Sequence, residues 1–368
     1  MKVNFIFSVG RKKRISSNEE IPSDFFYGYK ELEKYFNDIF LYEEEELGMK
    51  LKNKFLSIIF RKLSFFSIGI PLEMLYGFFI NKSFKKFKNN EILVATTNGI
   101  GLTLSIAKNL GFIKSSIVFI AMGLLPKEIN IFKKIIYKFI LRNVDIVLIS
   151  KSEENYFKEI MPDHKITYIP FGIDNKFWFR EDADFNQEYV LSIGNDKSRD
   201  WDTLIDAWET SFPKLKIITS KNIYTDKENI EIIKGNWRDN LLTDKEIRKL
   251  YGSSSFIVIP LKDTIQPSGQ SVCLQAMSCQ KSVIMSNIVG KWDSSMLINK
   301  KNIYLVKPYS KFLLNKAIKE LIENKSLNKT IAINSKKMVD NFYHKEIMAI
   351  NLIKLFEEID RKNKKFNY

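Results

Sequence analysis

The segment 266–287, QPSGQSVCLQAMSCQKSVIMSN, constrains the fold of this chain more than any other. It opens with a turn of small residues at 267–269 and continues with residues of helical character at 271–280. An apolar strand at 282–285 follows, and another at 256–260 precedes it. This order predicts a βαβ unit whose helix begins at the carboxyl edge of a parallel sheet. Unpaired N–H groups and the helix dipole make that edge an anion site, most often for phosphate.

The segment resembles the nucleotide-sugar-binding motif of GT-B glycosyltransferases, which reads roughly E-G-F-G-L-P-x-L-E-A-M-A-C-G-x-P-V-I. The residues that match in register are Leu274, Ala276, Met277, Cys279, Val283 and Ile284. Both glutamates of the E-x7-E pattern are missing, since the second is Gln275 and the first falls on Pro267, beside Gln266. The structural alternative is a βαβ unit of another doubly wound protein.

The resemblance implies roles for several residues of this segment. Gln275 would hold the ribose hydroxyls, where an amide still hydrogen-bonds but more weakly than a carboxylate. Gln266 would touch the donor sugar. The remaining substrate-binding residues at the start of the helix would be Ser268, Gly269, Gln270 and Ser271.

Composition agrees with two domains in a reducing compartment. The chain has 368 residues, 45% of them hydrophobic, enough for two cores. Its two cysteines, Cys273 and Cys279, lie in one predicted helix, which argues against a disulfide or a metal site and fits a cytoplasmic protein. Two histidines exclude a multi-histidine metal centre. Residues 1–10 read as a strand and a basic loop, not as a signal peptide.

Apolar strands and helical segments alternate along the chain, the pattern of parallel α/β sheets. In the first half we expect strands at 3–9, 92–96, 117–122 and 145–150 and helices at 25–35, 102–110 and 153–161. In the second half we expect strands at 189–193, 215–219, 230–233 and 302–306 and helices at 202–210, 244–251 and 311–323. The acidic run 43–46 is expected on a solvated loop or helix face.

Two further segments carry the family resemblance. Residues 166–174, ITYIPFGID, resemble the V-x-x-I-P-N-G-V-D element that ends the first GT-B domain. The resemblance implies an α/β GT-B fold of two Rossmann-like parallel-sheet domains facing a cleft. We predict an acceptor-side domain at 1–180, a nucleotide-sugar-binding domain at 188–343, and a C-terminal helix at 344–368 that crosses back to the first domain.

The second segment, 189–203, resembles the strand and loop in which an Arg and a Lys clamp the donor diphosphate. Asn195 stands where the Arg is usual, and Lys197 and Arg199 stand near the place of the Lys. A guanidinium suits phosphate oxygens, although a surface charge at a helix start is the simpler role for Arg199. Asn236 and Trp237 occupy the place where family members hold the nucleobase.

The net charge of +15 is unevenly distributed. Residues 50–89 contain nine Lys or Arg and one acid, Glu73, among many apolar residues, and a basic-apolar helix follows at 131–142. Such helices are typical of anionic membrane surfaces, although solvated lysines on core helices give the same pattern. Nucleic acid is a weaker alternative, because no nucleic-acid fold signature accompanies the charge. The apolar run 63–80 is interrupted by Gly69, Pro71, Glu73 and Gly77, so we expect a helix, a break and a second helix rather than a membrane span.

In the first half, Gly10, Asn98 and Gly99 follow predicted strands, and we expect them to approach the donor sugar, with tight turning as the alternative role of the two glycines. An inverting transfer would also need a general base, for which Asp24 is the candidate, with helix capping as its structural alternative. A retaining transfer would need no such base. The sequence leaves both routes open.

The resemblance implies a metal-independent glycosyltransferase without a cofactor, with a nucleotide-diphospho-sugar as donor. The acceptor would be a glycan, a lipid-linked sugar or a polysaccharide. A role in cell-envelope polysaccharide biosynthesis follows, at the inner face of the membrane and without a nucleic-acid partner. Two alternatives remain open: a nucleotide-sugar epimerase-like enzyme, and a non-catalytic protein that binds sugar nucleotides.

Overall fold

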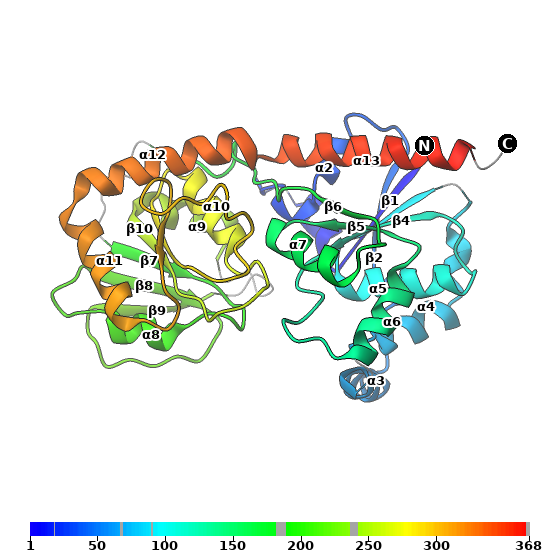
Figure 1. The fold of residues 1–368 in the computed structure, drawn as a ribbon, viewed down its shortest axis with the longest axis horizontal. Coiled ribbons are helices and arrows are strands. Elements are labelled where there is room, and N and C mark those ends of the chain that lie inside the picture. The colour runs from blue at the N-terminus through cyan, green and yellow to red at the C-terminus, as the bar shows by residue number, and fades with distance from the viewer. Residues whose placement is uncertain (18, 67–68, 90, 182–188, 236–241, 366–368) are drawn as a thin grey trace. The chain divides into compact units, whose positions relative to one another are not determined.

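The computed structural model describes residues 1–17, 19–66, 69–89, 91–181, 189–235 and 242–365. Contacts divide the chain into two compact units. Unit 1 comprises residues 1–19, 26–170 and 348–368, and unit 2 comprises 20–25 and 171–347. The sequence placed the boundary at 180–188 and all of the first 180 residues in one domain. The hexapeptide 20–25 therefore packs with the half of the chain that follows it much later (Figure 1).

Unit 1 is built on one six-stranded parallel sheet in the order β2-β1-β3-β4-β5-β6. Its strands are β1 (Val3–Phe7), β2 (Ile39–Glu43), β3 (Ile92–Ala95), β4 (Ser116–Ala121), β5 (Asp145–Leu148) and β6 (Ile166–Tyr168). Its helices are α1 (Arg11–Ile15), α2 (Tyr29–Leu32), α3 (Lys54–Phe66), α4 (Leu72–Ile80), α5 (Asn98–Asn109), α6 (Ile131–Leu141), α7 (Lys151–Ile160) and most of α13 (Lys345–Lys365). Short 3-10 turns lie at Asp24–Phe26 and Ser83–Lys86.

Unit 2 repeats this plan with a second six-stranded parallel sheet, in the order β12-β11-β10-β7-β8-β9. Its strands are β7 (Tyr189–Ile193), β8 (Lys214–Thr219), β9 (Ile230–Lys234), β10 (Ser254–Ile259), β11 (Val283–Ser286) and β12 (Tyr304–Val306). Its helices are α8 (Trp201–Ala207), α9 (Asp244–Ser253), α10 (Gln270–Ser278), α11 (Lys311–Glu323) and α12 (Lys325–Phe342).

The central strands are buried apolar runs, as expected for parallel strands covered on both faces. Strands β4 and β10, for example, have almost every side chain buried. Side chains cap the helices after β5 and β9: Ser150 accepts from Glu153 N at the start of α7, and Thr243 forms a capping box with Glu246 at the start of α9. These caps place each helix N-terminus at the carboxyl edge of its sheet.

Some sequence predictions were wrong in detail. The helix expected at 25–35 is reduced to the four residues of α2, because Tyr27 and Gly28 adopt positive φ angles of 48° and 78°. The acidic run expected on a loop begins with Glu43, which ends the edge strand β2. Helix α12 was not predicted. The helix, break and helix expected at 63–80 is confirmed by α3 and α4.

Candidate functional site

The order of the strands in unit 2 indicates a candidate ligand site. Strand β7 lies between β8 and β10, so the chain winds outward in opposite directions from the β7–β10 pair. Open α/β sheets bind ligands at this switch point, beyond the carboxyl ends of the strands. Two segments begin there: the loop 194–200 after β7, and the turn into α10 after β10.

Beside the equally buried Asp200, Arg199 is the cation buried at this switch point. Its exposed fraction is 5%, and its guanidinium approaches the backbone at both Gly194 and Gly269. A Cβ at position 194 would overlap the guanidinium, and one at position 269 would lie 3.1 Å from Arg199 Nη1. The residue that begins α10 is therefore in direct reach of a buried cation.

The guanidinium of Arg199 is only partly satisfied. Its Nε lies 3.4 Å from Asp196 Oδ2 in an ion pair, but both Nε and Nη1 are buried without a hydrogen-bond partner in the described chain. Burial lowers the pKa of Arg199 from its ordinary value. A buried donor without an acceptor is costly, so a site that keeps one is a candidate for binding an anion.

Backbone hydrogen bonds hold the Arg199 loop against the segment after β10. Lys262 N donates to Ser198 O over 2.8 Å, and Asp200 N donates to Pro260 O over 3.1 Å. Asp200 also accepts from Thr203 N and begins α8. The position of Arg199 is thus set by the same strand that leads into α10.

The start of α10 supplies the second half of an anion site. Gly269 adopts a left-handed conformation with φ of 77°, and no side chain caps the helix. Helix N–H groups and the helix dipole therefore lie beside the incompletely paired guanidinium of Arg199. A ligand with several anionic oxygens, such as a diphosphate, matches this combination.

Gln275 is not exposed to such a ligand. Its side chain is 1% exposed, its Nε2 donates to Asp24 Oδ2 over 3.0 Å, and its Oε1 accepts from the Tyr251 hydroxyl over 3.3 Å. Both ends of the amide are used inside unit 2. The ribose contact implied by the resemblance is therefore not available to Gln275 in this arrangement.

Asp24 lies elsewhere than the sequence suggested. It belongs to unit 2 rather than to the acceptor-side domain, and it is almost fully buried. Its carboxylate accepts hydrogen bonds from Asp174 N and Trp178 Nε1, each over 2.6 Å, and from Gln275. Burial raises the pKa of Asp24 to about 7 despite these three donors. A role as a general base stays a prediction, and we assign Asp24 to the packing of the 20–25 segment.

The other predicted residues of unit 2 differ in their placement. Asn195 joins neighbouring loops, because its Nδ2 donates to Gly235 O and its Oδ1 accepts from Ser220 N and Thr219 Oγ1. Lys197 and Gln266 are exposed, Ser268 and Ser271 are half-buried, and Gln270 is buried in the first turn of α10. Asn236 and Trp237 lie outside the described residues.

The predicted residues of unit 1 lie at its own switch point, where β1 and β3 are neighbours. Gly10 precedes α1 with φ of 98°, and a Cβ there would meet no atom within 4 Å. Asn98 bonds both backbone groups of Met122, with Nδ2 donating to the carbonyl and Oδ1 accepting from the amide. A Cβ at Gly99 would lie 2.6 Å from Met74 Sδ of α4, so Gly99 serves helix packing.

Sequence reasoning missed Glu153, a buried carboxylate at the carboxyl edge of unit 1. Its Oε1 accepts from Gly123 N over 2.6 Å, and its Oε2 is buried without a hydrogen-bond partner in the described residues. Burial raises its pKa to about 7. The sequence contained one signal for it. Glu153 lies three residues after Ser150, at the start of the helix that follows a predicted strand, so a place near the carboxyl edge of the sheet could have been inferred for its side chain.

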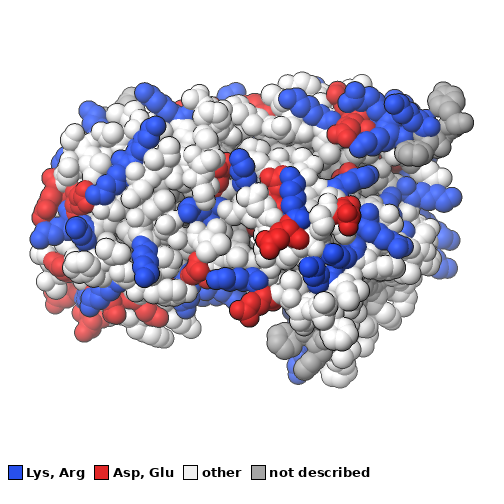
Figure 2. Space-filling view, viewed as in Figure 1, with Lys and Arg blue, Asp and Glu red and all other residues white. Residues whose placement is uncertain are grey.

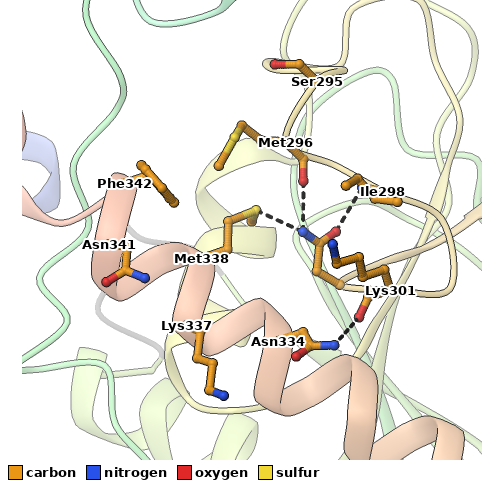
Figure 3. Close-up of a pocket in the computed structure, with 10 residues that line it drawn as sticks. Ser295, Met296, Ile298, Lys301, Asn334, Lys337, Met338, Asn341 and Phe342 are labelled. Carbon is orange, nitrogen blue, oxygen red and sulfur yellow. Dashed lines mark hydrogen bonds between the residues drawn. The ribbon is translucent and has the colours of Figure 1, made fainter.

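A cavity of about 250 Å³ lies elsewhere in unit 2, between α12 and the 295–302 loop (Figure 3). Met296, Met338 and Phe342 line it together with polar side chains, and none of the predicted site residues does. Asn302 bridges its wall by donating to Met296 O over 2.8 Å. Within the described ranges, no group of three or more His, Cys, Asp or Glu side chains is placed to hold a metal ion.

Comparison with known proteins supports the fold expected from the sequence. No protein-family model matches the chain. An uncharacterized glycosyltransferase of Methanocaldococcus jannaschii is 28% identical over 230 residues, which are 61% of this chain and 62% of that protein. The matched region thus spans less than two thirds of the relative's length.

Solved structures resemble the chain over nearly its whole length. HepE of Anabaena in complex with UDP has a TM-score of 0.68 at 12% identity, covering 97% of this chain and all of that one. Sucrose-phosphate synthase of Thermosynechococcus elongatus has a TM-score of 0.72 at 14% identity, covering 98% and 99%. A glycosyltransferase of Rickettsia africae has a TM-score of 0.64 at 15% identity, covering 97% and 98%.

Proposed function

Because this chain has the two-domain GT-B fold, we propose that it is a glycosyltransferase that uses a nucleotide-diphospho-sugar as donor. One observation carries the proposal: the buried guanidinium of Arg199, with Nη1 unpartnered in the described chain, lies beside the uncapped start of α10. This pair of positive groups matches the two phosphates of such a donor.

The chemistry needed at this place is stabilisation of a leaving diphosphate. Negative charge builds up on the diphosphate oxygens as the bond to the sugar breaks. Arg199 and the N–H groups of α10 are preorganised to receive that charge, because the protein has already removed them from water. We propose that they do so without a metal ion or a cofactor. Retention or inversion at the sugar stays open.

The similar proteins support this choice of ligand. The M. jannaschii relative is described as a glycosyltransferase, and HepE was crystallised with UDP and with UDP-glucose. UDP is therefore the first probe for this chain. The acceptor that we propose is a glycan, a lipid-linked sugar or a polysaccharide of the cell envelope.

Two experiments test the proposal in sequence. Calorimetric titration should show that UDP or another common nucleoside diphosphate binds with micromolar-range affinity, typical of substrate sites. Incubation with nucleotide sugars and candidate acceptors should then release nucleoside diphosphate. Absence of binding by every common nucleoside diphosphate would reject the proposal.

The same experiments separate the two alternatives. Conversion of the sugar nucleotide without release of nucleoside diphosphate would indicate an epimerase-like enzyme. Binding without any turnover would indicate a non-catalytic protein. The buried Gln275, hydrogen-bonded at both ends of its amide, is the feature that most favours the latter, because it replaces a motif glutamate with a structural amide.

We also propose that the protein works in the cytoplasm, at the inner face of the membrane. The support is the excess of Lys and Arg in residues 50–89. In the described chain, none of the helices combines the length and the hydropathy needed to cross a bilayer. Fractionation of cells should find the protein with membranes at low salt and release part of it at high salt.

A further inference from the structure

Helix α3 presents apolar side chains to solvent. Among its residues 54–64, Ser57 is the single buried one. Phe55 is 71% exposed, and the other large apolar side chains of the helix that are exposed are Leu56, Ile58, Ile59 and Leu63. A helix of a globular protein normally turns such residues toward the core. Here they form an outward-facing surface.

Helix α6 adds a second apolar face in the same unit. Ile131, Phe132, Ile135 and Phe139 are all exposed, with Phe132 at 72%, and their spacing places them on one side of the helix. The opposite side buries Tyr137, Ile140 and Leu141 in the core of unit 1. The exposed apolar residues of α6 therefore do not pack in the core of unit 1.

The two faces belong to one helical layer of unit 1. Helix α3 packs on α4, α4 on α5, and α5 on α6. Figure 1 shows α3 and α6 at the same end of unit 1, and in Figure 2 the surface over this end is largely uncharged. We call the nine exposed apolar residues of α3 and α6 the α3–α6 surface.

The charges on α3, α6 and their flanks are positive, and one of them, Arg61, forms an ion pair with Glu73 of α4 over 3.5 Å. Residues 50–66 and 129–143 contain nine Lys or Arg and no Asp or Glu. The guanidinium of Arg142 lies 4.2 Å from the ring centroid of Phe139, so a cation directly contacts one of the exposed aromatic side chains. An apolar face bordered by cations complements the acyl chains and the anionic headgroups of a bilayer together.

We propose that the α3–α6 surface inserts its apolar side chains into an anionic membrane. The lysines and arginines beside it would contact the lipid phosphates. A second copy of the chain fits less well, because the positive borders of two such surfaces would repel each other. Binding by charge alone, as the composition suggested, does not explain exposed phenylalanines and isoleucines.

This docking deepens the proposed function and narrows its acceptor. If the protein transfers sugar, as proposed above, unit 1 held on a bilayer would receive an acceptor that is itself anchored in the membrane. The chemical class that fits is a lipid-linked sugar. A soluble acceptor gains nothing from this surface.

The test compares two phenylalanines of nearly equal exposure. Phe132 on α6 belongs to the α3–α6 surface, and Phe312 on α11 of unit 2, 74% exposed, does not. Co-sedimentation is measured with phosphatidylcholine vesicles with and without phosphatidylglycerol. We expect the wild type to bind the anionic vesicles, Phe132→Ser to bind about tenfold more weakly, and Phe312→Ser to bind unchanged.

Three results would overturn the proposal. They are equal binding to neutral and anionic vesicles, equal effects of the two substitutions, and self-association of the wild type that Phe132→Ser abolishes while vesicles stay unbound. Circular dichroism confirms that each variant is folded. The assay contains no donor and no acceptor, so its outcome is independent of UDP binding, which tests the proposed function separately.

Discussion

The two units share one sheet plan but keep opposite charges at the carboxyl edges of their sheets. In unit 2, Arg199 is buried beside α10 with Nη1 lacking a partner in the described chain. In unit 1, Glu153 is buried at the start of α7 with Oε2 equally lacking one. A structural role would be better served by a fully paired group, since buried charges without partners reduce stability.

The difference in sign indicates a difference in task. A cation at a helix N-terminus attracts phosphate. A carboxylate in the same position accepts hydrogen bonds from hydroxyl groups, and burial raises its pKa to about 7. Asp24 provides a contrast in hydrogen bonding only: burial raises its pKa to about 7 as well, but its carboxylate accepts three hydrogen bonds.

The largest expected effect concerns the hydrogen bond between Gln275 and Asp24. Gln275→Glu restores the usual motif residue, yet it would place a second carboxylate about 3 Å from Asp24 Oδ2, where Gln275 Nε2 now donates. We expect a loss of about 3–5 kcal/mol in the free energy of unfolding above pH 7, where Asp24 is ionised. Chemical denaturation measures this loss.

Asp24→Asn in the same chain should restore most of that stability, because it removes one of the two charges. A double variant as unstable as Gln275→Glu alone would contradict the pairing. In the wild-type background, Asp24→Asn should leave UDP affinity unchanged.

The second prediction tests the unpaired cation. Arg199→Met should weaken UDP binding by about 1.5–3 kcal/mol, because a charged hydrogen bond to phosphate is lost. The same substitution should leave the ligand-free protein as stable as the wild type or more stable, since it removes an incompletely paired buried charge. Calorimetry and thermal denaturation measure the two effects.

Arg248 of unit 2 is the matched control. It is as buried as Arg199, but it is paired with Glu181 over 2.9 Å and donates to Phe177 O over 3.2 Å. Arg248→Met should destabilise the protein and leave UDP affinity unchanged. If both substitutions lower stability alike, Arg199 is a structural residue.

The third prediction tests the unpaired carboxylate. Burial raises the pKa of Glu153 to about 7 from 4.5, so the folded protein binds its proton more tightly than the unfolded chain. Its contribution to stability is then fully present below pH 4.5 and is lost as the pH rises through 7. Glu153→Gln still accepts from Gly123 N but cannot ionise. We expect the variant to be about 1–2 kcal/mol more stable than the wild type at pH 8, with a flatter pH dependence.

Turnover measurements test whether Glu153 takes part in the reaction or only lowers the stability of the fold. If Glu153 takes part in the reaction, Glu153→Gln should lower turnover and leave UDP affinity unchanged. Full turnover together with increased stability would show that the carboxylate has no part in the reaction.

The smallest expected effects compare a glycine from each unit. Gly269→Ala should cost about 1–2 kcal/mol, because alanine is disfavoured at a φ of 77° and its Cβ would crowd Ile259 at 2.9 Å. Gly99→Ala should change stability by less than about 1 kcal/mol, because the flexible Met74 side chain can move and alanine favours the helix. Thermal denaturation checks both, and only Gly269→Ala should weaken UDP binding.

The sequence predicted the elements whose signals are local. The bounds of β7 and α11 were predicted to the residue. Both elements have a local signal, an apolar run in β7 and the helical spacing of apolar side chains in α11. The role of Arg199 at the phosphate site came from the resemblance of the 189–203 segment to the diphosphate clamp of GT-B enzymes, not from a local pattern. Strand β2 was missed because it is only partly buried and ends in an acidic run.

The side-chain partners could not be predicted in this way. Gln275 meets Asp24 across 251 positions of sequence, and nothing near residue 24 indicates that it packs in unit 2. The sequence also does not show that Oε2 of Glu153 lacks a hydrogen-bond partner in the described chain, because this depends on which residues surround it in the folded protein. Residue types at the site were therefore readable from the sequence, whereas which of them face a ligand was not.

The path of the chain between the units has a consequence for biosynthesis. Helix α13, which buries Leu352 and Phe356 in unit 1, is translated after all of unit 2, and unit 2 itself needs residues 20–25 from the beginning of the chain. Unit 1 therefore cannot be completed until all of unit 2 has been translated, and unit 2 cannot be completed without a segment from the beginning of the chain. The protein therefore matures as a whole, and a gene fragment that encodes one half should yield a chain with an open apolar seam.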